Sequence, residues 1–133
     1  MFRMDFAMDF DAKNNILRLT ITGRLTDAVL LDVYATAARY VASHPPCRGI
    51  TDFSGVTEFE VSSSAIRDLA QTAPAFPTGY MRIVVAPKDH VYGMARMFQI
   101  VGADTRSDLH VVRTMDEAYR LLQVTSPEFS PVS

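Results

Sequence analysis

The sequence predicts an α/β domain with a mixed, mostly parallel sheet of about five strands, an N-terminal antiparallel hairpin and helices packed on the sheet. Apolar and polar residues alternate over residues 4–10 and again over 17–22, and a short Asp/Asn-rich turn joins the two runs, as in a hairpin. Residues 81–86, MRIVVA, form a nearly continuous apolar run, which is typical of a strand covered on both faces. After the hairpin, strand-like runs alternate with helical periodicity, and this order favours right-handed parallel crossovers.

The first helix is predicted to follow the hairpin directly. Gly23 is expected to end the second strand, and the side chain of Thr26 or Asp27 can accept hydrogen bonds from the free N–H groups of the first helical turn. Pro45 and Pro46 end this helix because proline cannot continue it. Apolar residues recur along one helical face between these limits: Leu30, Tyr34, Ala37 and Val41.

Residues 48–69, RGITDFSGVTEFEVSSSAIRDL, are the most informative stretch of the chain. They predict a short buried strand over 50–53, a polar turn through Ser54 and Gly55, and a helix that three serines open and that ends near Thr72. A strand that delivers polar groups to a helix N-terminus is where α/β folds place their sites.

The second half of the chain repeats the strand–helix order. Asp89 is predicted to cap a helix that ends at Gly102, and residues 109–112 form the next strand. Thr114 and Glu117 have the spacing of a capping box ahead of the last helix. We expect one domain over residues 1–124 and a flexible tail over 125–133, which contains two prolines and few apolar residues.

The composition is that of a globular protein. With 133 residues, of which 48% are hydrophobic and 21% charged, the chain is long enough for a single core. Its net charge of −2 argues against a nucleic-acid partner. Cys47 is the one cysteine, so we expect no internal disulfide and a reducing compartment. No apolar run approaches the ~20 residues of a membrane span, and residues 1–13 lack the pattern of a secretory signal. We therefore expect a cytoplasmic protein.

The first strand also suggests an assembly. Its one certain partner is the strand after the hairpin turn, so its other edge is expected to be free unless the fold inserts it. Exposed strand edges invite pairing with another chain, and two-fold dimers are the commonest oligomers. We predict a homodimer with the N-terminal hairpin, or the helix face over residues 93–98, at its interface.

Polar side chains follow several predicted strands at the edge where α/β sheets bind ligands. We predict that a ligand or partner binds there to eight residues: Asp52, Ser54, Ser62, Ser63, Lys88, Asp89, His90 and Arg113. Two interpretations stay open for each group. The serines either cap the helix or hold a phosphate at its N-terminus. Asp52 either accepts N–H groups of the turn or lines the site. The charged residues of the later loops either bind an anion or form a solvated surface.

The sequence contains no recognised catalytic set. No nucleophile elbow, Walker loop or dinucleotide fingerprint occurs. The histidines, His44, His90 and His110, lack metal-ligand spacing, and no second cysteine supports Cys47 as a ligand. We therefore expect no enzyme activity, no cofactor and no metal site.

Three stretches resemble a known family. DFSGVTEF, residues 52–59, resembles the Asp-Leu-Ser-Gly-Val-Thr segment of the STAS domain, and ILRLTITGRLT, residues 16–26, resembles the early strand of that domain running into a glycine. MRIVVAPKDHVYGMARMF, followed by LHVVRTMDEAYRLL, looks like the closing half of the bacterial SpoIIAA-like (STAS/SEC14-type) proteins. In one branch of that family a serine after an aspartate is phosphorylated. Glu60-Val61, or Ser62 or Ser63 with a short insertion, takes that place here without the aspartate, so the resemblance does not carry the switch to this chain.

The resemblance implies a non-catalytic regulatory or protein-interaction module of STAS-like type. The alternative is a carrier or sensor domain of SEC14-like type, because SEC14-like relatives bind small molecules or lipids in an apolar pocket. The chain has enough aromatic residues to line such a pocket: Phe53, Phe59, Phe76, Tyr80, Tyr92 and Phe98.

Overall fold

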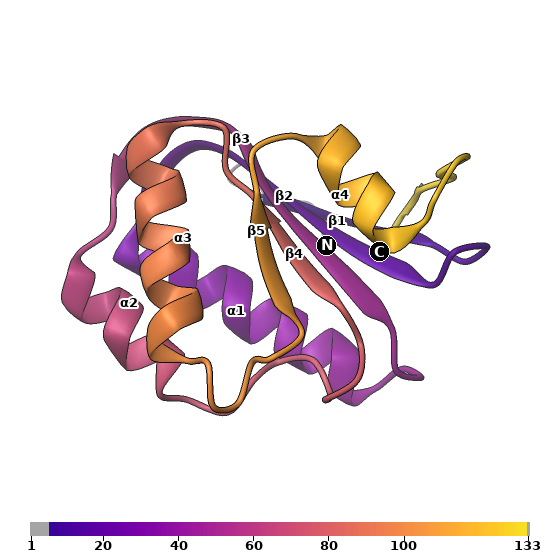
Figure 1. Ribbon diagram of the computed structural model, residues 1–133, viewed down its shortest axis with the longest axis horizontal. Coiled ribbons are helices and arrows are strands. Elements are labelled where there is room, and N and C mark those ends of the chain that lie inside the picture. The colour runs from indigo at the N-terminus through magenta and orange to yellow at the C-terminus, as the bar shows by residue number, and fades with distance from the viewer. Residues whose placement is uncertain (1–5, 133) are drawn as a thin grey trace.

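The computed structural model describes residues 6–132, which form an α/β fold with a six-stranded mixed sheet and four helices packed on it (Figure 1). The predicted fold class is therefore confirmed. Its elements follow in chain order: β1 (Phe6–Asp11), β2 (Ile16–Thr26), α1 (Asp27–Ala42), β3 (Arg48–Glu60), α2 (Ser63–Ala70), β4 (Arg82–Val85), α3 (Asp89–Val101), β5 (Leu109–Val112), α4 (Met115–Leu122) and β6 (Ser130–Pro131).

The strand order across the sheet is β5-β4-β3-β2-β1-β6. β1 and β2 pair antiparallel as the predicted hairpin, and β2, β3, β4 and β5 pair in parallel. β4 lies between β3 and β5, as its unbroken apolar run predicts for a strand that is covered on both faces.

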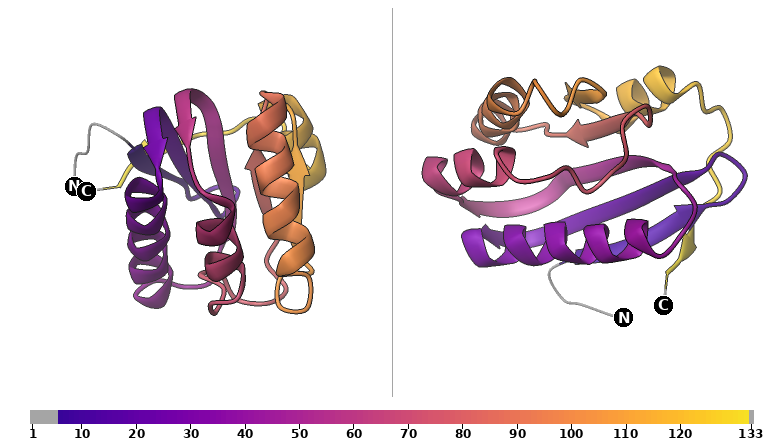
Figure 2. Two further views of the ribbon diagram at one scale, coloured as in Figure 1. Left: turned by 90° about the vertical axis from the view of Figure 1, so that its left-hand side faces the viewer. Right: turned by 90° about the horizontal axis from the view of Figure 1, so that it is seen from below.

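The helices divide between the two faces of the sheet because side chains alternate along each strand. Val84 of β4 packs with α2 and α3, whereas its neighbours Ile83 and Val85 pack with α4. α1 packs over β2 on the same face as α2 and α3. Figure 1 shows α3 and α4 on opposite sides of β4 and β5, and Figure 2 shows α1, α2 and α3 side by side. The face that carries α1, α2 and α3 is called the three-helix face below.

β3 is much longer than its sequence suggests. The predicted polar turn at Ser54 and Gly55 is wrong, and so is the predicted end of β2 at Gly23, because the two strands stay paired as far as Thr26 and Glu60. Two register shifts, at each of which β3 has one more residue than β2, absorb the irregular segment, and one of them follows Gly23, whose φ is +76°. A Cβ atom at Gly55 would lie 2.9 Å from the Cγ2 atom of Thr22, so glycine is needed where the strands approach most closely.

The helix starts follow the predicted caps with one exception. The Thr26 hydroxyl accepts a hydrogen bond from the Val29 N–H at 3.3 Å, and the Thr114 hydroxyl accepts one from the Glu117 N–H at 3.1 Å. The prediction that Asp89 caps α3 is wrong. Lys88 occupies the N-cap position without a side-chain capping bond. Asp89 is the first helical residue, where its negative charge interacts favourably with the positive end of the helix dipole.

The C-terminal segment lies against the outer edge of β1. Ser130 and Pro131 pair with Phe10 and Asp9, and Phe129 packs against the core beneath α4. The Arg18 guanidinium lies 3.9 Å from the centre of the Phe129 ring. β6 therefore covers part of the strand edge on which the homodimer prediction was based.

Asp11 anchors this segment from the β1–β2 turn. Its buried carboxylate accepts hydrogen bonds from the N–H groups of Asn14 and Glu128, each at 3.0 Å, and from the Asn14 side-chain amide at 2.6 Å. Burial by itself would raise the pKa of Asp11, but these hydrogen bonds hold the pKa below its ordinary value of 3.8. The ionised carboxylate therefore stabilises the fold.

The substitution Asp11→Asn is expected to lower the free energy of unfolding by about 1–2 kcal/mol at neutral pH, because it removes a charged acceptor from buried donors. The carboxylate contributes its stability above the unfolded pKa and loses it as the pH falls through the lower folded pKa. The difference between wild type and Asp11→Asn should therefore shrink below pH 3.8. Urea unfolding at pH 7 and pH 3 checks this, with the exposed Asp104→Asn as the control. An equal difference at both pH values would contradict it.

Candidate functional site

The predicted residues at the carboxyl ends of β4 and β5 are tied to their neighbours. Arg113 forms an ion pair with Asp89 at 2.8 Å and stacks 3.9 Å above the Tyr92 ring. The Lys88 ammonium donates a hydrogen bond to the Val56 carbonyl at 2.5 Å. The His90 ring meets the Phe59 ring edge-on, with centroids 5.3 Å apart. These contacts fasten the start of α3 to β3 and β5.

The other predicted residues lie in separate places. The Asp52 carboxylate accepts the Ser54 N–H at 2.9 Å, which is the local turn interpretation, and the alternation along β3 puts this side chain on the α4 face. The Ser62 hydroxyl caps α2 by accepting the Ala65 N–H at 3.1 Å. The Ser62 hydroxyl also donates a hydrogen bond to the Asp27 carboxylate at 2.8 Å. Ser63 is the first residue of α2 and is exposed.

The structure thus distributes the predicted residues over several small groups, each with its own local contacts. Asp89 pairs with Arg113, and Asp52 accepts from Ser54, while Ser62 is joined to α1 through Asp27. Both cations at this edge, Lys88 and Arg113, already have oxygen partners. The exposed Arg113–Asp89 pair contributes little to stability, and its two charges offset each other.

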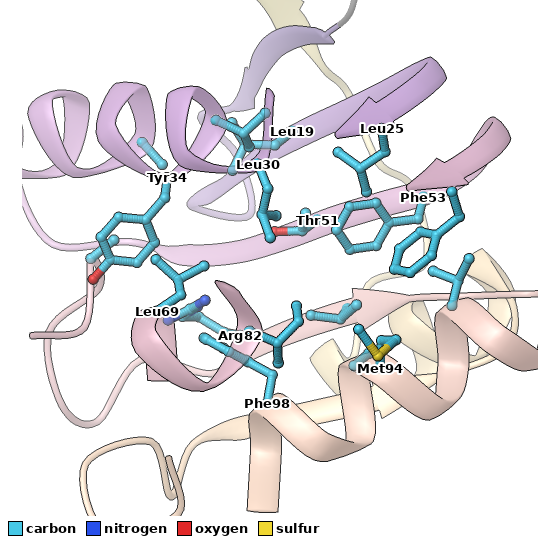
Figure 3. A pocket seen from close by; sticks show the side chains of 18 of the residues that line it. Leu19, Leu25, Leu30, Tyr34, Thr51, Phe53, Leu69, Arg82, Met94 and Phe98 are labelled. Carbon is cyan, nitrogen blue, oxygen red and sulfur yellow. The ribbon is translucent and has the colours of Figure 1, made fainter. Parts of the chain in front are cut away.

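A different feature has the character of a ligand site. An apolar pocket lies on the three-helix face, between α1, α2, α3 and the sheet, and its volume is about 90 Å³ (Figure 3). Its walls come from β2, β3 and β4 and from all three helices. They include Leu19, Leu30, Leu69, Val84, Met94 and Phe98.

Arg82 is a charged residue in the wall of this pocket. It is the first residue of β4 and belongs, with Val84, to the residues whose side chains face the three helices. Figure 3 shows its guanidinium nitrogens among the pocket side chains, near Leu69 in that view. Its guanidinium carbon lies 5.0 Å from the centre of the Phe76 ring. Gly49, beside Arg82 on β3, leaves room for that ring, because a Cβ atom there would lie 2.6 Å from Phe76.

Arg82 forms no ion pair within the part of the chain that the structure describes. The cations in the ion pairs of residues 6–132 are Arg18, Arg24 and Arg113. No side-chain hydrogen bond within this range joins Arg82 to an acidic residue. Burial, and then the nearby positive charge of Arg106, lower the pKa of Arg82 from its ordinary value to about 10.

Arg106 has a different role although it is even more buried, at 4% exposure. Its guanidinium donates hydrogen bonds to the carbonyls of Ala70, Leu69 and Thr72 at 2.6, 3.2 and 3.1 Å, and so satisfies the C-terminal end of α2. Arg106 is therefore structural, and its charge repels Arg82 rather than neutralising it.

Part of this pocket was predictable from the sequence. Among the aromatic residues named for a carrier domain, four line it: Phe53, Phe59, Phe76 and Phe98. Tyr80 lines a neighbouring hollow, and Tyr92 lies under Arg113. Arg82 was not predicted, although it is the one charge inside the apolar run MRIVVA, because its position at the start of the run resembles an ordinary exposed strand end.

Other reactive groups in the described part of the chain do not add a site. Cys47 is buried against Leu17 and Phe76, and burial raises the pKa of its thiol, which disfavours the reactive thiolate. No cluster of three or more His, Cys, Asp or Glu residues within 6–132 is arranged to hold a metal ion. None of the helices in this range has both the length and the apolar character needed to cross a membrane. A second hollow, of about 460 Å³, lies at the surface between the β1–β2 turn and the C-terminal segment, and its lining includes Lys13 and Glu128.

The chain was compared with known proteins. A scan against protein-family models finds no match, and a search of curated proteins finds none either. The resemblance to the STAS and SpoIIAA-like proteins therefore stays a prediction.

Proposed function

We propose that this chain is a small-molecule-binding domain, of the carrier or sensor kind, whose ligand occupies the apolar pocket on the three-helix face. One observation carries the proposal: the pocket combines an apolar, largely aromatic and aliphatic wall with a single unpaired cation, Arg82. Small-molecule sites have this composition, in which apolar side chains supply affinity and a few polar groups fix orientation.

The form of the pocket supports the same function. Met94 in its wall has a flexible side chain that adapts to ligands of different shape. The Tyr34 hydroxyl donates to the Ala73 carbonyl and so ties α1 to the loop after α2, which closes one side of the pocket. The volume of about 90 Å³ corresponds to about three water molecules at liquid density, so the enclosed part of the ligand is small.

Binding of a neutral short-chain molecule tests this proposal. On titration with 1-pentanol we expect saturable shifts in the NMR signals of the methyl groups of Leu69, Val84 and Met94, and none at Leu121 beyond the sheet. The substitution Ala95→Leu fills the pocket and should weaken binding about tenfold or more, because the added methyl groups occupy the space of the ligand. The exposed Ala28→Leu on α1 is the matched control. Equal shifts on both faces, or unchanged binding by Ala95→Leu, would contradict the proposal.

The regulatory or protein-interaction module of STAS-like type, the homodimer, the bacterial origin and the cytoplasmic location stay predictions. One contact bears on the phosphate interpretation at the start of α2. A phosphate on Ser62 would face the Asp27 carboxylate, which lies 2.8 Å from the Ser62 hydroxyl, and like charges at this distance repel. This contact favours the capping interpretation of Ser62.

A further inference from the structure

The most unusual group in the molecule is the Arg82 guanidinium. Buried or half-buried charges in proteins are normally paired, because a charge removed from water without a partner is unfavourable. Arg82 instead lies beside Phe76 and near a second arginine, and no acidic group of residues 6–132 forms an ion pair with it. Asp108 lines a neighbouring hollow with Arg82, but its carboxylate accepts the Gly79 N–H at 2.7 Å.

The surroundings of Arg82 indicate the chemical class of the group that would pair with its guanidinium. The Nη groups of Arg106 are already committed to three carbonyls at the end of α2, so Arg82 is the guanidinium that the pocket wall offers to a ligand. The planar fork of a guanidinium matches the two oxygens of a carboxylate, and a pair formed away from water is stronger than one at the surface.

We propose that the natural ligand of the pocket is a small carboxylate with a short apolar tail, and that its carboxylate pairs with Arg82 while its tail lies among Leu69, Val84 and Phe98. This inference rests on the proposed function and adds the chemical class of the ligand. The volume of about 90 Å³ limits the enclosed tail to about three or four carbon atoms, since it holds about three waters. A longer chain would have to extend past α2 or α3.

Pairing with a ligand also gives a reason for a charged residue at position 82, whose charge forms no ion pair within residues 6–132. Without ligand, the guanidinium lies in an unfavourable place. With a carboxylate bound, the same burial strengthens the ion pair, because water no longer competes for either partner. Arg82 is thus the specificity-determining residue of the site.

The test compares two ligands of equal shape and different charge, pentanoate and pentanamide, by NMR titration of the pocket methyl groups at pH 7. Wild type is expected to bind pentanoate about tenfold more tightly than pentanamide, as for a charge-assisted pair against a neutral one. The substitution Arg82→Met should reduce this preference to about twofold or less, because the charged donor is removed for both ligands. Arg82→Lys should retain part of the preference, because it keeps the charge and loses the fork. The exposed Arg67→Met on α2 is the control and should bind as wild type does.

The outcomes separate the two proposals. Equal affinity of wild type for pentanoate and pentanamide, with shifts confined to the pocket, would overturn the carboxylate inference and leave the proposed function standing. A preference for pentanoate that survives in Arg82→Met would also overturn the inference. Failure of both ligands to shift any pocket methyl group would contradict the proposed function and the inference together.

Discussion

Replacing Arg106 by methionine is expected to lower the free energy of unfolding by about 3 kcal/mol, because hydrogen bonds from a charged donor to buried carbonyls are lost and those carbonyls are left without partners. Arg106 is 4% exposed and bonds Ala70, Leu69 and Thr72 at the end of α2. Its guanidinium carbon also lies 4.7 Å from the centre of the Phe98 ring. Methionine fills a similar space but donates nothing to the helix end.

Urea unfolding measures this loss, and Arg67→Met provides the matched control. Arg67 is an exposed arginine of α2, the helix whose end Arg106 bonds. Its substitution should therefore change stability by no more than about 0.5 kcal/mol. The Nε–H of Arg106 already lacks a hydrogen-bond partner within residues 6–132, so the expected loss comes from the Nη groups alone. A loss for Arg106→Met no larger than that of the control would show that solvent or a rearranged loop satisfies the end of α2.

Arg82→Met is expected to do the opposite and raise the free energy of unfolding of the ligand-free protein by about 1–2 kcal/mol, because a half-buried charge without a counter-charge is replaced by an apolar side chain. The folded pKa of Arg82, about 10, lies well below the ordinary value of an arginine. Folding therefore opposes the charged form, and the cost is present in full at neutral pH. It is relieved only as the pH rises above about 10.

The same urea experiment measures this gain, again against Arg67→Met. A more stable protein that no longer distinguishes a carboxylate from an amide is the expected pattern for a residue kept for binding at the expense of stability. A loss of more than about 1 kcal/mol in Arg82→Met would show that Arg82 holds the β4–α2 region together, and that its charge is compensated within the protein.

The fold class was predictable because it depends on local periodicity. The alternation seen in β1 and the apolar run seen in β4 each lie within one element, so each is visible in the local sequence. The length of β3 was not predictable, because Ser54 and Gly55 have turn propensity and only pairing with Thr22 and its neighbours on β2 keeps them extended. Likewise, β6 forms because a distant strand edge, β1, accepts it.

The site was harder to predict than the fold for a related reason. Polar residues at predicted strand ends, such as Asp52 and Lys88, attract attention in a sequence, yet here they bond to backbone groups of the protein. Arg82 stands at the start of a strand, where a charge looks like an ordinary exposed end. Only the packing of Phe76 and the committed bonds of Arg106 make Arg82 an unpaired cation in an apolar pocket. Neither feature is visible without the tertiary structure.

A crystal structure of the protein with pentanoate shows directly whether Arg82 binds a carboxylate in the pocket. We expect a carboxylate oxygen within hydrogen-bond distance of an Arg82 nitrogen, with the tail against Leu69, Val84 and Phe98 on the three-helix face. Pentanoate bound at the Lys88 and Arg113 edge, with the pocket empty and Arg82 unpaired, would contradict it.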